Sequence, residues 1–357
     1  MKITQVKSWK ENLELTRPYT IAYRTIDQVE NVFLYIELEN GLSGIGAGSP
    51  AEFVTGESIT ESINTLDDYA QDLLVGQDIR HFQALIREAG RLMPDTPAAL
   101  ACVDIALHDA FARYLGLPLV DFLGRAHHQL PTSITIGIKD LDDSLREARE
   151  FVQAGFRVIK LKTGKSAEED IETVTRLRET VGPDIHIRID ANQGYSAAEL
   201  KRFAAATQSQ HVEFYEQPLP PEHLEAMLSL PGSLRRRCAA DEDLHGPADA
   251  IRMAASPQPY GIYNIKLMKC GGVAAARQIS AVAEKSGLHL MWGCNDESIV
   301  SITAALHAAL ASPATRYLDL DGSFDLARDV VEGGFILKDG YLLTGEKAGL
   351  GTQLIDF

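Results

Sequence analysis

The chain has 357 residues, 45% of them hydrophobic and 24% charged, and a formal net charge of −16. This composition is typical of a globular protein, and the length suits one barrel of about 250 residues with a smaller second domain. The negative charge argues against nucleic acid and anionic membranes as partners. No apolar run approaches the roughly 20 residues of a membrane span. The charged N-terminus lacks the apolar segment of a signal peptide, so we expect a cytoplasmic protein.

The four cysteines, Cys102, Cys238, Cys270 and Cys294, are far apart in the sequence. Because no two of them form a CxxC pair, their spacing does not favour a disulfide framework or a structural zinc site. We expect buried free thiols.

The N-terminal part predicts a small α+β domain. Its expected strands are Ile3–Lys10, Asn31–Glu39 and Leu42–Ala47, the last two joined by the turn signal Asn40-Gly41. A polar and aromatic loop, Thr16–Ile26, is expected between the first two strands. The expected helices are Thr55–Leu74 and Ala98–Leu115, and Gly116 ends the second.

From Thr132 onward, short β-rich runs alternate with helical segments. The expected strands are Ser133–Ile138, Arg157–Lys162, Ile185–Asp190, Glu213–Glu216, Arg237–Asp241, Gly261–Lys266, His289–Trp292 and Arg316–Asp319. The helices between them include Ser144–Ala154, Ala167–Thr180 and Val273–Ser286. Such alternation predicts parallel strands joined by right-handed crossovers.

Ionisable residues end five successive predicted strands, at intervals of 25 to 28 residues: Lys162, Asp190, Glu216, Asp241 and Lys266. An open doubly wound sheet also alternates, but it is not expected to carry ionisable groups at five consecutive strand ends. In a closed barrel those ends converge on one mouth, where active sites lie. We therefore predict an α/β protein with a (β/α)7β TIM-like barrel over residues 126–321. An α+β capping domain over 1–125 precedes it, and a Gly-rich segment with short strands, 322–357, returns to that domain.

Side chains alternate along a strand, so each strand predicts what faces the barrel interior. Lys160 and Lys162 share one face of their strand, and Asp319 and Asp321 share one face of the last strand. The apolar residues between them are expected to pack against the outer helices. The polar set therefore faces the interior or its mouth.

Three carboxylates, Asp190, Glu216 and Asp241, end consecutive predicted strands. Close together and unpaired they would repel one another, and a hard divalent cation resolves this. An all-oxygen ligand set favours Mg²⁺, with Mn²⁺ as a substitute. The alternative is three separate carboxylates, each paired with its own cation.

Lys162 and Lys266 lie about four strand–helix units apart, which places them on opposite sides of the mouth. A lysine acts as a base near neutral pH when burial or a neighbouring cation lowers its pKa, and Lys160 and the metal are candidate neighbours. This arrangement predicts removal of a proton beside a carboxylate by one lysine, stabilisation of the enediolate by the metal, and proton return by the other lysine. The product would have inverted configuration.

At these residues the sequence resembles the enolase superfamily, muconate-lactonising-enzyme subgroup, over essentially the whole chain. The matching motifs are Lys160-Leu161-Lys162, Asp190-Ala191-Asn192, Glu216-Gln217-Pro218, Asp241-Glu242 and Asn264-Ile265-Lys266. The resemblance implies a capping domain, three carboxylate ligands for a metal, and an acid/base pair of lysines. A homo-oligomer is an expectation at the level of the family.

Within that subgroup the sequence is most similar to the dipeptide epimerases, through Asp319-Leu320-Asp321. The resemblance implies that this pair holds the ammonium group of a dipeptide. Two carboxylates at the mouth and away from the metal also favour a cation on electrostatic grounds. The alternative is a charged strand end without a ligand.

The preferred side chains of the dipeptide are a separate hypothesis. In this family the loop Thr16–Ile26 closes over the substrate, and Arg24 would suit an acidic side chain, as in Ala-Glu. Glu52, Asp296 and Glu297, in segments expected to border the site, favour a basic side chain instead. We hypothesise a cationic dipeptide, with Ala-Glu as the alternative. Thr135 and Cys294 are further candidates to line the site.

Other functions stay open on this scaffold. Cycloisomerisation, o-succinylbenzoate synthesis and N-acylamino acid racemisation use the same lysines and metal, but none calls for an ammonium clamp at Asp319 and Asp321. A sugar-acid dehydratase of the superfamily would have a histidine base in place of Lys266. A non-catalytic binding protein is the remaining alternative, against which the lysine pair and the three carboxylates count.

Overall fold

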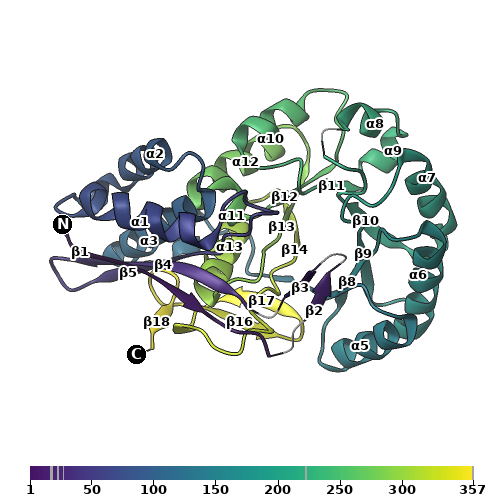
Figure 1. The fold of residues 1–357 in the computed structure, drawn as a ribbon, viewed down its shortest axis with the longest axis horizontal. Coiled ribbons are helices and arrows are strands. Elements are labelled where there is room, and N and C mark those ends of the chain that lie inside the picture. The colour runs from purple at the N-terminus through teal and green to yellow at the C-terminus, as the bar shows by residue number, and fades with distance from the viewer. Residues whose placement is uncertain (17–18, 22–23, 27, 222, 356–357) are drawn as a thin grey trace.

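The protein, described by a computed structural model, consists of a small α+β region and a barrel that lie side by side (Figure 1). The structure describes residues 1–16, 19–21, 24–26, 28–221 and 223–355, and it leaves the side chains of 17–27 undescribed. None of the helices it describes has the length and apolarity needed to cross a membrane. The division into domains at residues 125 and 321 stays a prediction.

The N-terminal region is a three-stranded antiparallel sheet covered by helices. The strands are β1 (Ile3–Asn12), β4 (Glu30–Leu38) and β5 (Ser43–Gly48), in the order β1-β4-β5. The helices are α1 (Ile59–Leu74), η1 (Ile79–His81), α2 (Phe82–Leu92), α3 (Pro97–Leu115) and α4 (Leu119–Leu123). The three predicted strands and the turn at Asn40-Gly41, where Gly41 has φ +80°, are confirmed.

Three details of this region differ from the expectation. The first helix begins at Ile59 and not at Thr55, because Ser58 accepts a hydrogen bond from the Glu61 amide while Glu61 accepts one from the Ser58 amide. The segment expected as a loop contains a hairpin, β2 (Tyr19–Ile21) with β3 (Arg24–Ile26). The short helix α2 was not predicted.

Eight parallel strands form the barrel, in the order β14-β13-β12-β11-β10-β9-β8-β7. Their bounds are β7 (Ser133–Ile136), β8 (Val158–Lys162), β9 (His186–Asp190), β10 (Val212–Glu216), β11 (Cys238–Ala240), β12 (Ile262–Ile265), β13 (His289–Trp292) and β14 (Thr315–Leu318). A parallel bridge between Thr132 and Leu318 joins the first strand's start to the last strand and closes the ring. The predicted (β/α)7β barrel is confirmed, with every strand within two residues of its expected ends.

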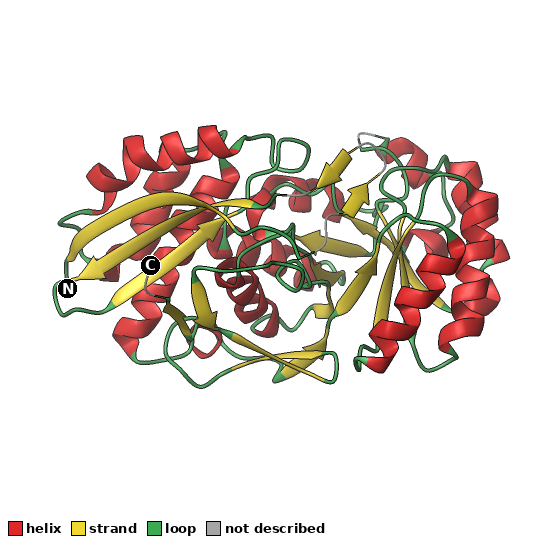
Figure 2. Ribbon diagram, turned by 60° about the horizontal axis from the view of Figure 1, so that its bottom comes forward, coloured by secondary structure: helices red, strands yellow, loops and turns green. Residues whose placement is uncertain are grey.

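Helices surround the barrel, as Figure 2 shows. They are α5 (Leu141–Gln153), α6 (Ala167–Val181), α7 (Ala197–Ala206), η2 (Gln208–Gln210), α8 (Leu224–Leu228), α9 (Gly232–Arg235), α10 (Pro247–Ala254), α11 (Leu267–Cys270), α12 (Val273–Lys285) and α13 (Ile299–Leu310). The predicted faces are confirmed, because Ile159, Leu161, Ile187 and Ile189 are buried in the core that packs on the helices. A separate cluster that includes Phe214 and Met291 fills the barrel interior.

The segment after Asp321 carries the short strands β15 (Val331–Gly333), β16 (Phe335–Lys338), β17 (Tyr341–Thr344) and β18 (Thr352–Leu354). β17 pairs with β6 (Gln129–Pro131), just before the barrel. The same segment bonds to the N-terminal region, where the Thr16 amide donates to the Asp325 carbonyl at 2.8 Å and the Gly349 amide to the Leu117 carbonyl at 2.9 Å. The tail therefore contacts both parts of the molecule.

Candidate active site

The three predicted metal ligands lie at the same end of adjacent strands. Asp190 ends β9, Glu216 ends β10, and Asp241 directly follows β11; all three are buried. The parallel register pairs Asp190 with Lys162 on one side and with Glu216 on the other, so these side chains lie at one level of the barrel. The expected convergence of strand ends is confirmed.

These carboxylates interact electrostatically. Burial, followed by repulsion from Asp190, raises the pKa of Glu216 to about 8, and Asp241 adds to the same effect. The buried Oε2 atom of Glu216 lies 2.8 Å from Lys160 Nζ in an ion pair, although the geometry is not that of a hydrogen bond. A buried carboxylate with raised pKa beside two others is a set of oxygen donors that a hard divalent cation would stabilise. The residues therefore fit a magnesium ion in their chemistry.

In this structure lysine ammonium groups neutralise the carboxylates. Lys160 Nζ lies 2.7 Å from Asp319, 2.8 Å from Glu216 and 3.1 Å from Asp190. Among the described residues, no group of three or more His, Cys, Asp and Glu side chains is arranged as a ready metal cage. The oxygens that would hold a cation are here paired with lysine ammonium groups.

Lys162 and Lys266 lie on opposite sides of the carboxylates, because β8 and β12 are separated by β9, β10 and β11. Lys162 Nζ is 2.7 Å from Asp190 Oδ2, and Lys266 Nζ is 2.9 Å from Asp241 Oδ2. Their side chains keep 27% and 12% of their surface exposed, whereas that of Lys160 keeps 5%. A ligand at the mouth can reach the first two lysines, and Lys160 lies at the floor.

The charges around the lysines act against burial. Burial disfavours the ammonium form of Lys266, but Asp241 and Glu216 outweigh it and raise the pKa of Lys266 above its ordinary value. Three carboxylates likewise raise the pKa of Lys160 well above its usual range despite burial. The same ion pairs also stabilise the charged form of the acidic partner. Lys162 and Lys160 outweigh the effect of burial and lower the pKa of Asp190 to about 2.

Backbone strain follows two of the carboxylates. Asn192 and Gln193, shortly after Asp190, have φ of +43° and +68°, and Gln217, directly after Glu216, has φ of +30°. Such conformations are costly for residues other than glycine and cluster at functional sites. The Gln217 side chain also accepts a hydrogen bond from the Asp241 amide at 3.0 Å, which ties two of the strand ends together. Sequence reasoning did not assign this role to Gln217.

Asp319 and Asp321, predicted as one ammonium clamp, have different surroundings. Asp319 is buried and contacts Lys160 and the hydroxyl of Ser133. Asp321 is half-buried and accepts a hydrogen bond from the Thr135 amide at 2.8 Å. No Lys or Arg in the described part of the chain forms an ion pair with Asp321, so its charge remains available to a cation. Burial, followed by Asp319, raises the pKa of Asp321 to about 7.

The remaining predicted residues lie in loops. Asp296 is half-buried, and its carbonyl accepts a hydrogen bond from Ser49, at the end of β5. Glu297 is buried and not a surface charge, and burial raises its pKa to about 7. Glu52 is exposed. The Arg24 side chain lies outside the described part.

The cysteines carry no disulfide, as predicted. Cys102 and Cys238 are buried, whereas Cys270 and Cys294 are partly exposed, which corrects the expectation of four buried thiols. The Cys294 thiol lies 3.2 Å from the Asp319 carbonyl, and burial raises its pKa well above the ordinary value. A thiol held in its neutral form is a poor nucleophile.

Lys269 was missed by the sequence reasoning. It is buried, and its ammonium contacts the Asp241 carbonyl oxygen and, at 2.5 Å, Asp241 Oδ1. Asp241 therefore lies between Lys266 on one oxygen and Lys269 on the other. The spacing of Lys266 and Lys269 across the short helix α11 is the sequence feature that could have indicated this contact.

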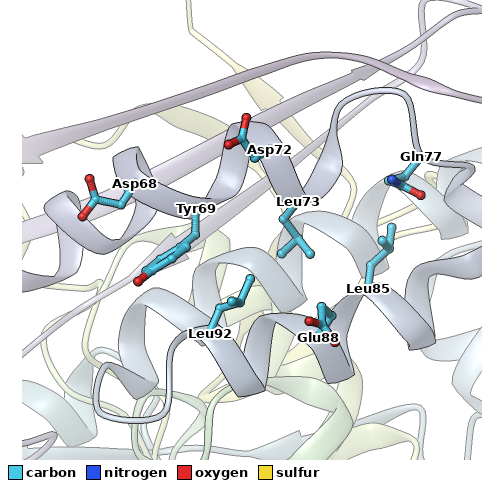
Figure 3. A pocket seen from close by; sticks show the side chains of 8 residues that line it. All are labelled: Asp68, Tyr69, Asp72, Leu73, Gln77, Leu85, Glu88 and Leu92. Atoms are coloured by element: carbon cyan, nitrogen blue, oxygen red, sulfur yellow. The ribbon is translucent and has the colours of Figure 1, made fainter.

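A groove of about 570 Å³ lies elsewhere, between α1 and α2 (Figure 3). It is lined by Asp68, Tyr69, Asp72, Leu73, Gln77, Leu85, Glu88 and Leu92. Its lining has carboxylates but no lysine, and none of it comes from the barrel. The groove therefore lacks the groups that the predicted chemistry needs.

Comparison with known proteins agrees with this geometry. Residues 3–124 match the family model of the mandelate racemase / muconate lactonizing enzyme N-terminal domain, and residues 143–356 match the enolase C-terminal domain-like model. The chain is 56% identical to the L-Lys-D/L-Arg epimerase of Desulforapulum autotrophicum, over 99% of this chain and 100% of that protein. It is 29% identical to the L-Ala-D/L-Glu epimerase of Bacillus subtilis, over 98% of this chain and 96% of that one.

A solved structure is similar throughout. The crystal structure of the dipeptide epimerase from Methylococcus capsulatus, complexed with Mg and the dipeptide L-Arg-D-Lys, superposes with a TM-score of 0.97. The sequence identity is 52%, and the match covers 99% of both chains. Family models and relatives thus agree over almost the whole length. The protein belongs to the mandelate racemase / muconate lactonizing enzyme family of the enolase superfamily.

Proposed function

We propose that the protein is an epimerase of cationic dipeptides that inverts the α-carbon of the C-terminal residue. The observation that carries the proposal is the placement of Lys162 and Lys266 on opposite sides of three buried carboxylates. Two bases facing each other across one carbon can take a proton from one side and return it from the other. The relatives named as epimerases of Lys- and Arg-containing dipeptides support the same reaction.

Asp190, Glu216 and Asp241 would hold Mg²⁺, or Mn²⁺ as a substitute. The bound ion supplies positive charge for the substrate carboxylate and for the negative charge that develops when the neighbouring proton leaves. Mg in the similar Methylococcus capsulatus structure supports this choice of metal.

The two lysines must differ in protonation when substrate arrives. The neutral lysine removes the α-proton, and the charged one donates from the opposite face, so the product has inverted configuration. Asp241 and Glu216 raise the pKa of Lys266 and so favour its ammonium form. When these carboxylates are engaged in coordination, burial remains and favours the neutral amine.

The charges at the mouth support a cationic substrate over Ala-Glu. Asp319 and Asp321 follow the last barrel strand, and Asp296 and Glu297 follow β13. A second positive group on the substrate gains from this excess of carboxylates, whereas a glutamate side chain would be repelled. We further propose that Thr135 and Arg24 border the substrate.

The test is incubation of a dipeptide library with Mg²⁺ in heavy water, followed by mass spectrometry. Epimerisation replaces the α-hydrogen by deuterium, so every dipeptide that is a substrate gains mass. The experiment therefore identifies substrates without assuming them in advance. We expect faster exchange for Lys- and Arg-containing dipeptides than for L-Ala-L-Glu. Faster exchange of L-Ala-L-Glu would refute the cationic preference, and no exchange in any dipeptide would refute the reaction.

We also propose that the protein acts in the cytoplasm, since its four cysteines are all free thiols. A homo-oligomer is a further prediction. Size-exclusion chromatography with light scattering would measure its mass in solution.

A further inference from the structure

Beneath the candidate site, polar side chains form a continuous chain through the barrel interior. It runs from Glu213 to Arg188, Ser133, Asp319 and Lys160, and links five of the eight strands or their ends. Arg188, Ser133, Asp319 and Lys160 are all buried. Buried polar groups of this kind fix one arrangement when every member has a partner.

Arg188 anchors the lower part of this chain. Its guanidinium lies over the rings of Phe214 and Tyr317, 5.4 Å and 5.0 Å from their centroids, and the two rings contact each other with centroids 4.8 Å apart. It donates to Glu213 at 2.9 Å through Nε and to the Leu318 carbonyl at 2.7 Å through Nη1. Contacts with two rings and two acceptors restrain this side chain.

Ser133 connects Arg188 to the site. Arg188 Nη1 lies 3.3 Å from the Ser133 hydroxyl oxygen, which accepts this hydrogen bond. The hydroxyl has a single proton to donate, and Asp319 Oδ1 at 2.5 Å is closer than the Leu318 carbonyl at 3.2 Å. Ser133 therefore directs its proton to Asp319.

Asp319 thus has both carboxylate oxygens engaged within the protein. Oδ1 accepts from Ser133, and Oδ2 lies 2.7 Å from Lys160 Nζ. Lys160 in turn touches Asp190 and Glu216, at the floor of the site. Asp321 is bonded instead to Thr135, through the amide at 2.8 Å and through the side chain, and it forms no ion pair with a Lys or Arg of the described residues.

We propose that Ser133 and Arg188 are positioning residues that hold Asp319 in place as the anchor of Lys160. The inference deepens the proposed function and rests on it for its kinetic part. Asp319 then acts on the chemical step, because Lys160 places a positive charge beside Lys162 and the reacting carboxylate. Asp321, for which the family resemblance already implies contact with the substrate ammonium, is the comparison residue.

The kinetic test compares variants on the fastest cationic dipeptide. Ser133→Ala and Asp319→Asn should each lower kcat by roughly tenfold to a hundredfold with little change in KM, since a small misplacement of a reacting group has effects of that size. Asp321→Asn should raise KM by roughly tenfold with a smaller change in kcat. Asp319→Asn acting on KM alone would overturn the inference.

Two further variants separate positioning from general damage. Ser133→Thr keeps the hydroxyl and should retain most of the activity. Ser280→Ala removes a buried hydroxyl that donates only within α12 and should leave kcat and KM unchanged. Equal losses in Ser133→Thr and Ser133→Ala would mean that the hydroxyl is not responsible, and would overturn the inference.

A second measurement needs no substrate and tests the inference even if the protein turns over no dipeptide. Unfolding free energies of single and double variants should show coupling between Ser133→Ala and Asp319→Asn, since the two share a hydrogen bond. Ser133→Ala and Asp321→Asn should be additive. Additivity in the first pair would overturn the inference, while absence of turnover with coupling intact would refute the proposed function alone.

Discussion

At the residue scale, the most specific expectation concerns the separate duties of the two lysines. Lys162→Met and Lys266→Met should each lower the rate of epimerisation by a factor of at least ~100, because one of the two proton transfers is lost. Each variant should still exchange the α-proton of one epimer with solvent, since the remaining lysine faces that side. Nuclear magnetic resonance of each pure epimer in heavy water measures this. Exchange of the same epimer in both variants would place the lysines on one face.

Lys269, which was not among the predicted site residues, pairs with Asp241, which was. Lys269→Met should lower the free energy of unfolding by about 1.5–3 kcal/mol, the usual loss for a hydrogen bond to a charged group. Urea denaturation in the absence of Mg²⁺ measures the change. Lys285→Met is the matched control, because Lys285 is exposed and its one ion pair within the described part of the chain is with its neighbour Glu284. Equal stability of the two variants would contradict a structural role for the Lys269–Asp241 pair.

At the element scale, the N-terminal region contacts α12, the barrel helix that comes after β12 and Lys266. Asp104, buried in α3, accepts hydrogen bonds from the Val273 and Ala274 amides at 2.7 Å and 3.1 Å, in the first turn of α12. The preceding Gly272 has φ of +109°, and a side chain there would overlap Asp104. One carboxylate from another part of the chain thus caps α12.

Asp104→Ala should therefore destabilise the protein by roughly 1–2 kcal/mol, as expected for loss of a helix cap. Asp104→Asn keeps one oxygen and should cost less. Chemical denaturation of both variants measures which of them loses more free energy of unfolding. A larger loss of stability in Asp104→Asn than in Asp104→Ala would show that capping of α12 does not explain the stabilising effect of Asp104.

At the scale of the whole molecule, the buried carboxyl groups predict how stability depends on pH. Burial raises the pKa of Glu297 and Asp321 to about 7 and that of Glu216 to about 8. In the unfolded chain these groups titrate near their ordinary values of about 4. The folded state therefore holds more protons between about pH 4 and the folded pKa values, so its stability falls as pH rises over that range and the loss is complete once the folded groups have titrated.

Without Mg²⁺, the thermal midpoint should fall between about pH 6.5 and pH 8.5 for this reason. His307, whose pKa burial lowers to about 3, acts in the opposite direction, but its effect is complete near pH 6.5. Glu297→Gln should reduce the slope, and Mg²⁺ should reduce it further by engaging Glu216. Calorimetry in a chelating buffer measures the midpoints, and a midpoint that rises over this range would contradict the assignment.

The sequence by itself determined the features that depend on local order. Strand ends at Lys162, Asp190 and Glu216 could be predicted because side chains alternate along each strand and parallel connections bring the ends to one side. The barrel, its eight strands and the opposite placement of the two lysines followed from the regular spacing. The helix α2 could not be predicted with the same ease, because it is short and contains Gly90.

Only the tertiary structure decided which charges meet. Lys160 and Asp319 are 159 positions apart, and Ser133 and Asp319 are 186 apart, so their contacts depend on closure of the barrel. The burial of Glu297 and the pairing of Lys269 with Asp241 likewise depend on what packs against them. Spacing along a strand gives the direction of a side chain, but a hydrogen bond or an ion pair also requires the position of its partner.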